Sequence, residues 1–413
     1  MNKLNNQNLN DKSKKKLVLT FIAVLGVISF FSDFTHEGAR SIYGQYLKII
    51  GVSAFLISFT SGLGEFIGQA LRIVTGIIAD KTKKYWLMMI IGYGVNLLAI
   101  PLLGLVDNDI WYVAIILILL ERVGKAIRSP AKSTLTSFTS DQIGAGKAFA
   151  INEALDQFGA FLGPMIVFLV VSNSAKSELS TYQMCFGLLG IIAIMALVLL
   201  TIAKSKYPHP ENFEKPKTNK GGIKGNKLFI IYMLAISFLA LGFIDYPLIA
   251  YHFGNVNIID VAYVPLLYSI AMGVDAIAAL LFGYIFDKKG IIVITISTLI
   301  SAFASPFIFL SNTKFMLVLG IIAWGIGMGA QESILKAVVA RIIPKEKRAT
   351  GYGIFNSVFG LAWFLGSLIV GALYDYSIIF LVVFSVIMEL ASISLIIYFK
   401  IKESKQIDTK NQI

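Results

Sequence analysis

Long apolar segments alternate with short polar segments along the whole chain. Each apolar segment has about 20 residues or more, which is the length a helix needs to cross a hydrocarbon core about 30 Å thick. So many segments cannot all be buried in one soluble domain, so the pattern predicts an all-α integral membrane protein with twelve transmembrane helices. The expected spans are residues 17–46, 53–79, 86–106, 110–137, 143–172, 181–203, 227–252, 260–286, 290–311, 314–341, 347–374 and 377–400.

The polar segments predict how the spans are grouped. Residues 204–226 form the only long polar segment in the interior of the sequence, are rich in Lys, Gly, Asn and Pro, and lie near its middle. This composition is typical of a linker between domains. We therefore expect two bundles of six helices, residues 17–203 and 227–401, with polar tails at residues 1–16 and 402–413.

Lysines predict the orientation of the spans. They are concentrated before the first span and after the even-numbered spans, whereas the opposite loops carry few cations. Cytoplasmic loops of membrane proteins carry such an excess of Lys and Arg. Both termini are therefore expected in the cytoplasm, in a multi-pass protein of the cell inner membrane.

Composition excludes several classes of function. The chain is 56% hydrophobic and 15% charged, and its net charge of +12 comes largely from the loop lysines, so neither a soluble domain nor a nucleic-acid partner is expected. One Cys and three His leave no metal-ligand spacing, and no Gly-x-x-x-x-Gly-Lys-Ser/Thr loop occurs. We expect no metal, no cofactor and no enzymatic activity.

Charged residues within the predicted spans are the most informative feature. Each costs about 2.5–3.5 kcal/mol on insertion scales, so such residues are expected to face the protein interior or a solute pathway. They are frequent in spans 1, 2, 4 and 5, whereas spans 3, 6 and 9 carry none and span 12 carries only Glu389. Every third helix is therefore expected at the periphery, facing lipid.

Spacing places many of these charges on common helix faces. Asp33, Glu37 and Arg40 follow i, i+4 and i+7, and a second stripe on span 4 begins at Glu121 and Lys125. The charges either bind solute and protons or form static salt bridges, and both interpretations fit the sequence. The candidate substrate or proton site comprises Asp33, Glu37, Arg40, Glu65, Glu121, Arg122, Lys125, Glu153, Asp156, Asp245, Tyr246, Gln331, Glu332 and Lys336.

A motif after the second span resembles the loop signature of the major facilitator superfamily. That signature combines a Gly, a small residue, an Asp and a basic cluster; here the candidate gating residues are Gly76, Asp80, Lys81 and Lys84, with Asp287 in a degenerate second copy. The resemblance implies that Gly76 approaches the eleventh helix. It also implies that Asp80 interacts with the N-terminal end of that helix and latches the cytoplasmic side.

Two further segments are similar to signatures of the same family. Arg122 matches a buried Arg of its helix-4 signature, and Gly159-Ala-Phe-Leu-Gly-Pro164 looks like part of the antiporter signature of its helix 5. The resemblance implies two bundles around a midplane cavity lined by spans 1, 4, 7 and 10, with alternating access between the two sides of the membrane.

The sequence therefore predicts a secondary active transporter of a small polar or charged solute, proton-coupled and inclined to efflux or antiport. Protons, the solute and the lipid bilayer are the expected partners, and a monomer is expected. Two alternatives stay open: a proton-independent facilitator or symporter, and a membrane sensor that has kept a transporter fold without transport.

Overall fold

The computed structural model describes residues 11–139, 145–175, 177–210, 227–256, 258–342 and 348–411, which are helical with no strands. In the first half the helices are α1 (Asp11–Ile49), α2 (Ala54–Thr82), α3 (Tyr85–Leu102), α4 (Trp111–Ser137), α6 (Ala145–Ser172) and α7 (Glu178–Lys206). In the second half they are α8 (Lys227–Gly242), α9 (Tyr246–Val256), α10 (Val264–Lys289), α11 (Ile292–Ala302), α12 (Ala304–Phe309), α13 (Lys314–Ile342), α14 (Arg348–Tyr376) and α15 (Ile378–Asn411).

The predicted twelve-span architecture is confirmed. Eleven helical segments in the described residues are long and apolar enough to cross a membrane, and α4 has the length but not the apolarity, because it carries five charged residues. Helices α1 and α15 extend beyond the predicted spans, from Asp11 and to Asn411. Most of the predicted linker, residues 211–226, lies outside the described residues.

Two spans are broken in the middle, which the spacing of apolar residues did not predict. The seventh span is interrupted at residues 243–245, between α8 and α9, and the ninth at Phe303, between α11 and α12. Pro247 lies four residues after Phe243, and Pro306 lies four residues after Ala302. In a regular helix the carbonyl of the earlier residue would accept a hydrogen bond from the N–H of the later one. A proline lacks the N–H that this carbonyl would accept, and its ring collides with it, so the helix breaks there.

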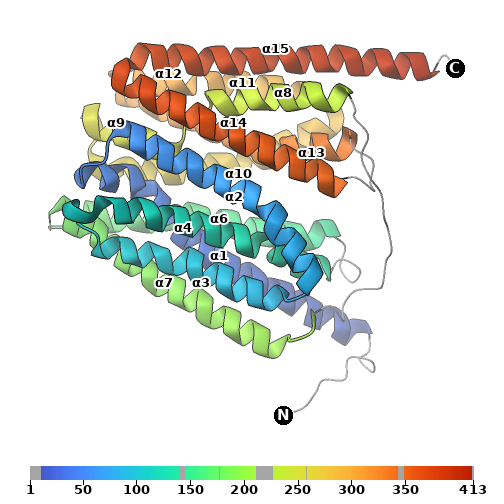
Figure 1. The fold of residues 1–413 in the computed structure, drawn as a ribbon, viewed down its shortest axis with the longest axis horizontal. Coiled ribbons are helices and arrows are strands. Elements are labelled where there is room, and N and C mark those ends of the chain that lie inside the picture. The colour runs from blue at the N-terminus through green and yellow to red at the C-terminus, as the bar shows by residue number, and fades with distance from the viewer. Residues whose placement is uncertain are drawn as a thin grey trace.

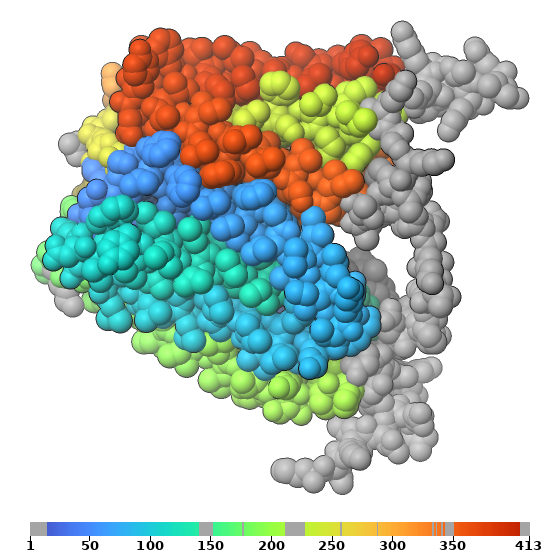
Figure 2. Space-filling view, in the orientation of Figure 1, coloured from blue at the N-terminus to red at the C-terminus, as the bar shows by residue number. Residues whose placement is uncertain are grey.

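The two six-helix bundles face each other across a few helix pairs. Figure 1 shows the first half below and the second half above, with α2 crossing beside α14 in the middle. The described start of α1 and the end of α15 lie at the same end of the molecule, which we call the terminal end. Figure 2 shows the two halves in contact along α2 and α14.

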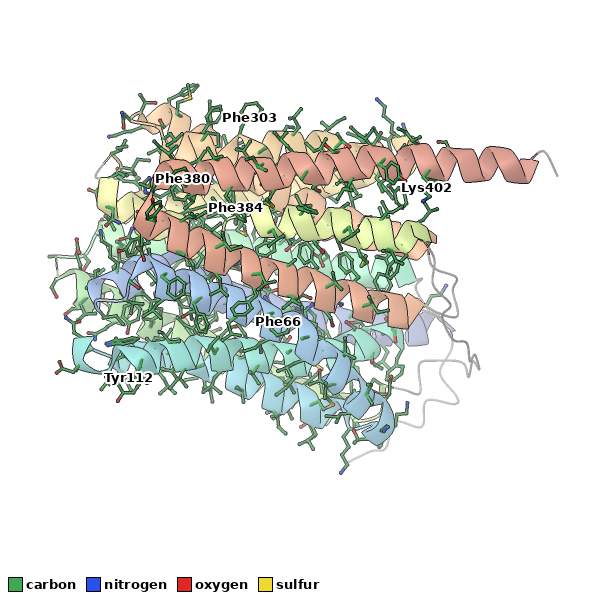
Figure 3. All side chains as sticks on the ribbon, turned by 45° about the horizontal axis from the view of Figure 1, so that its top comes forward. Phe66, Tyr112, Phe303, Phe380, Phe384 and Lys402 are labelled. Atoms are coloured by element: carbon green, nitrogen blue, oxygen red, sulfur yellow. The ribbon has the colours of Figure 1, made fainter. Side chains whose placement is uncertain are left out.

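The outer surface of the bundles is apolar, as a lipid-facing surface must be. Phe303 and Phe380 are each about half exposed and project from the outer helices in Figure 3. On α7, exposed side chains recur at Ile191, Ile194 and Val198. Water would penalise such a surface, whereas lipid does not, so the predicted peripheral position of the sixth span is confirmed. Glu389 of α15, the acidic residue in the twelfth span, does not belong to this outer surface, because it is only 2% exposed.

The end opposite the termini is closed by contacts between α1 and α9. Gln45 donates a hydrogen bond to the Ala250 carbonyl, and Lys48 donates one to the Gly254 carbonyl. Gly44 lets the two backbones touch, since a Cβ there would lie 2.0 Å from the Pro247 carbonyl oxygen. The bundles therefore meet at this end with no room for a solute between α1 and α9.

Replacing Gly44 with Ala should destabilise this closed end. The added Cβ would collide with backbone atoms that cannot rotate away, and overpacking of this kind costs about 1–3 kcal/mol. We expect the melting temperature of the purified protein to fall by several degrees. Gly94→Ala is the matched control: nothing lies within 4 Å of its added Cβ, so alanine should be neutral or stabilising in that helix. Equal melting temperatures for the two variants would show that the α1–α9 contact does not carry this constraint.

Candidate functional site

A cavity of about 370 Å³ lies between the two bundles on the terminal side of the closed end. It is lined by α1, α2, α4 and α6 of the first half and by α13 and α14 of the second. Spans 1, 4 and 10 line it as predicted, but span 7 does not, because its two half-helices lie behind Trp363 and on the closed side. Spans 2, 5 and 11 take part instead.

Most of the predicted site residues meet in this cavity. Those that line it are Asp33, Glu37, Arg40, Glu65, Arg122, Lys125, Glu153, Asp156, Gln331 and Glu332. The first stripe of charges on α1 therefore faces the cavity in full. The cavity is also charge-balanced by count, with six basic residues (Arg40, Arg72, Arg122, Lys125, Arg128, Lys132) against six acidic residues (Asp33, Glu37, Glu65, Glu153, Asp156, Glu332).

Four predicted site residues are not among the described residues that line the cavity. Tyr246 is fully buried, and its hydroxyl donates a 2.6 Å hydrogen bond to the Val264 carbonyl, so it has a packing position. Asp245 is also buried, but it contacts two side chains that do line the cavity. The side chain of Lys336 lies outside the described residues.

Glu121, the fourth of these, points away from the cavity into the first bundle. Its carboxylate lies 2.8 Å from Nδ1 of His36 and accepts a hydrogen bond from the Asn96 amide. The stripe on α4 therefore lines the cavity from Lys125 onwards as predicted, but at its start Arg122 and not Glu121 faces the cavity. Asn96 lies on span 3, and a search for charged residues could not have found it.

Ion pairs hold most of the cavity charges in place. Arg122 lies 2.8 Å from Glu65, and Lys132 lies 2.7 Å from Asp156. Arg128 lies 3.5 Å from Asp33, and its guanidinium also stacks 4.4 Å from the ring centre of Tyr93. The candidate site did not include Arg72, Arg128 or Lys132. Their spacing nevertheless predicts that they share helix faces with candidate residues: Arg72 follows Glu65 by seven residues, and Arg128 and Lys132 follow Lys125 by three and seven.

Two cavity cations have no such partner. Among the described residues, no carboxylate lies within 4.0 Å of Lys125 or Arg72, and neither side chain makes a hydrogen bond. Lys125 is half-buried at the centre of the α4 face. A cation that has lost part of its hydration without gaining an ion-pair partner is costly.

Contacts across the two bundles form the inner end of the cavity. Arg40 of α1 donates a 3.1 Å hydrogen bond to Asp245, whose other oxygen accepts a 2.9 Å bond from the Trp363 indole. Nearby, Tyr268 of α10 donates a 2.6 Å hydrogen bond to Glu37. Arg40 also lies 3.7 Å from Glu37 and 3.8 Å from Glu65, so it has further acidic neighbours in its own bundle.

The gating residues lie at the terminal end. Among the described residues a Cβ on Gly76 would meet Pro130 of α4, at 3.8 Å, and the side chains at the start of α14 are not described, so the approach of Gly76 to the eleventh helix stays a prediction. Asp80 is exposed on α2, Lys81 lies in its last turn and Lys84 precedes α3. The side chains of Asp287 and of residues 343–350 lie outside the described residues, so the Asp80 latch stays a prediction.

Twelve spans in two bundles, closed at one end around a charged cavity, define a membrane transport protein. Comparison with known proteins gives the family. The model of the Major Facilitator Superfamily matches residues 22–300 and, a second time, residues 228–412. The chain belongs to this superfamily, whose members are transporters and not enzymes.

Relatives and solved structures agree with this assignment. An uncharacterized protein of Mycobacterium tuberculosis (strain ATCC 25618 / H37Rv) is 35% identical over 381 residues, covering 90% of this chain and 91% of its own length. An uncharacterized MFS-type transporter of Methanocaldococcus jannaschii is 29% identical over 385 residues, covering 91% and 92%. The crystal structure of the nucleoside transporter NupG superposes with a TM-score of 0.71 at 15% identity, covering 92% of this chain and 98% of that one, which shows a shared fold.

Proposed function

We propose that this protein exports a small organic anion across the cell membrane by proton-coupled alternating access. With the termini in the cytoplasm, the cavity opens to the cytoplasm and the α1–α9 contact closes the outer side. The observation that carries the proposal is the cavity itself, where no described carboxylate lies within 4.0 Å of Lys125 or Arg72, whereas the other four basic residues are ion-paired.

An anionic substrate accounts for the unpaired cations. A carboxylate or phosphate group would complete the coordination of Lys125, and Arg72 presents a planar fork of donors that suits the same groups. The volume of about 370 Å³ lies in the range of sites that enclose a small molecule. The aromatic residues Phe355, Phe359 and Trp363 of the second half offer apolar contact to the remainder of the solute, beside the polar residues Gln331, Glu332 and Asn356 of the same wall.

The ion pair between Arg40 and Asp245, which joins the two bundles, supports proton coupling. Opening the outer side requires α1 to part from α9, and this would leave Asp245 without Arg40. Breaking a buried ion pair in this way costs about 3–5 kcal/mol. A proton on Asp245 would remove most of that cost, while Arg40 could move to Glu37 and Glu65, which lie less than 4 Å away.

Export is supported by the fifth span. Its segment from Gly159 to Pro164 is similar to part of the antiporter signature. Both glycines of this segment pack against the backbone of α1: a Cβ on Gly163 would lie 2.1 Å from the Phe34 carbonyl oxygen. Helix α6 is therefore held tightly to the helix that carries Arg40 and Glu37.

A binding screen followed by a flux measurement tests the proposal. Purified protein is heated with a panel of mono- and dicarboxylates, sugar phosphates and nucleotides, and with cations of matched size. We expect some anions and no cations to raise the melting temperature. The binding anion is then loaded into proteoliposomes, and an imposed pH gradient should drive its movement. Binding without movement in either direction would indicate a sensor, and movement indifferent to the pH gradient would indicate a facilitator.

A further inference from the structure

A second, small cavity lies inside the C-terminal bundle, separate from the cavity between the bundles. It encloses about 10 Å³, close to the minimum that one water molecule occupies. It lies where both broken spans are interrupted, since Phe243 and Ile244 line it from the first break and Ala304 lines it next to the second. The remaining wall includes Glu389 of α15, whose role the main cavity does not explain.

The polar groups in this pocket are not satisfied by the protein alone. One oxygen of Glu389 accepts a 3.4 Å hydrogen bond from Ser301, and the other has no described partner although the residue is only 2% exposed. Ser305, 3% exposed, also lines the pocket with an unpartnered hydroxyl. Ser385 lines it too, with its hydrogen donated to the Gly242 carbonyl and its lone pairs left over.

The electrostatics of the pocket favour a positive charge. Helices α8 and α11 end next to it, at Gly242 and Ala302, and α9 and α12 begin next to it, at Tyr246 and Ala304, so the partial charges of these helix ends largely offset one another. Pro247 and Pro306 withhold the N–H groups that would cover the Phe243 and Ala302 carbonyls. No described Lys or Arg pairs with Glu389. A buried carboxylate without a cationic side chain beside it is costly unless a cation or a proton joins it.

We propose that this pocket binds one dehydrated sodium ion, held by Glu389 and the hydroxyls of Ser301, Ser305 and Ser385. All of these ligands are oxygens, which hard cations prefer. A single carboxylate neutralises a single positive charge, whereas divalent ions are usually held by more charged oxygens. The small volume favours sodium over larger monovalent ions.

The bound ion would stabilise the break in the seventh span. Phe243 and Ile244 of that break line the pocket, and the next residue is Asp245, which pairs with Arg40 across the bundles. The indole of Trp324 donates a 2.7 Å hydrogen bond to the Ile244 carbonyl and fixes the same turn. Occupancy of the pocket is thereby linked to the contact that holds the outer side closed.

The test measures the thermal stability of the purified full-length protein in sodium, potassium or choline chloride at constant ionic strength and pH. It reads binding of the ion alone, so its outcome does not depend on the proposed transport. We expect sodium to raise the melting temperature saturably, by roughly 3–5 °C. No difference between sodium and choline, or an equal effect of potassium, would overturn the assignment.

Variants test whether the sodium-dependent rise in melting temperature comes from this pocket. Glu389→Gln should lose the sodium-dependent rise, while Glu178→Gln, at an exposed position at the start of α7, should keep it. Ser305→Ala retains the carboxylate and should raise the sodium concentration at half-effect at least about threefold, so it decides the matter if Glu389→Gln fails to fold. An unchanged half-effect concentration in Ser305→Ala would contradict the proposal, as would a full sodium response in folded Glu389→Gln.

Discussion

Lys125→Gln should abolish binding of the transported anion while leaving the empty protein as stable as before, or more stable. In the unliganded cavity Lys125 has no acidic partner, so removing its charge removes a cost. In the liganded cavity the same charge would pair with the substrate. Losing one partner of such a buried pair costs about 2–5 kcal/mol, which weakens binding at least about thirtyfold. Melting curves with and without the anion found in the screen measure both effects.

A matched variant separates this role from a structural one. Arg122 belongs to the same helix face but pairs with Glu65 at 2.8 Å. Arg122→Gln should therefore lower the stability of the empty protein, by about 1–3 kcal/mol, because Glu65 loses its 2.8 Å partner and keeps only Arg40, at 3.8 Å. Lys206→Gln, exposed at the end of α7, should change neither property. A large loss of stability in Lys125→Gln without ligand would show that Lys125 supports the fold, and would remove it from the proposed site.

The architecture could be predicted from the sequence because lipid imposes simple rules. Every backbone polar group must be satisfied within its own helix, so span length and apolarity define the helices almost completely. Charges are similarly informative, since the cost of burial confines them to the interior, and the α1 stripe faces the cavity as its spacing predicts. The ends of the first and last helices were less predictable. Helix α15 continues to Asn411 through a polar segment, where apolarity no longer indicates whether the chain is helical.

Details that depend on contacts between helices could not be predicted. Glu121 and Arg122 are adjacent, and only the packing of α3 and α1 decides that Glu121 turns towards Asn96 and His36. In the sequence, the break in the seventh span is flanked by Gly242 and Pro247. However, Pro130 and Pro164 lie inside helices that continue through them, so a proline by itself does not identify a break. Neither Tyr268 nor Trp363 carries a charge, and their hydrogen bonds to Glu37 and Asp245 appear only when the bundles meet.

A proton on Asp245 could control whether the two bundles stay in contact at the closed end. Its two oxygens are held by Arg40 of the first bundle and Trp363 of the second. When the carboxylate is charged, the pair holds α1 to the seventh span and the outer side stays closed. When the carboxylate is neutral, Arg40 retains Glu37 and Glu65 as neighbours, so separation leaves no charge uncompensated. Loss of this proton would restore the pair with Arg40 and close the outer side again.

Asp245→Asn, which imitates the protonated state, should therefore uncouple the carrier without blocking it. We expect exchange of the anion across proteoliposomes to continue within about threefold of the wild-type rate, while accumulation driven by a pH gradient disappears. Amide hydrogen exchange in α9 should also quicken, because the weakened pair lets the outer contact open more often. Asp375→Asn, exposed at the end of α14, provides the control and should preserve both activities.

The two readouts distinguish a coupling role from damage to the cavity. A variant that merely misfolds loses exchange and gradient-driven accumulation together, whereas loss of coupling affects accumulation alone. Gradient-driven accumulation that persists in Asp245→Asn would remove this carboxylate from the mechanism and leave Glu37, with its Tyr268 partner, as the remaining acid that spans the bundles. Glu37→Gln keeps an oxygen that can accept the Tyr268 hydrogen bond but removes the titratable group, so it would then be expected to show the uncoupled behaviour.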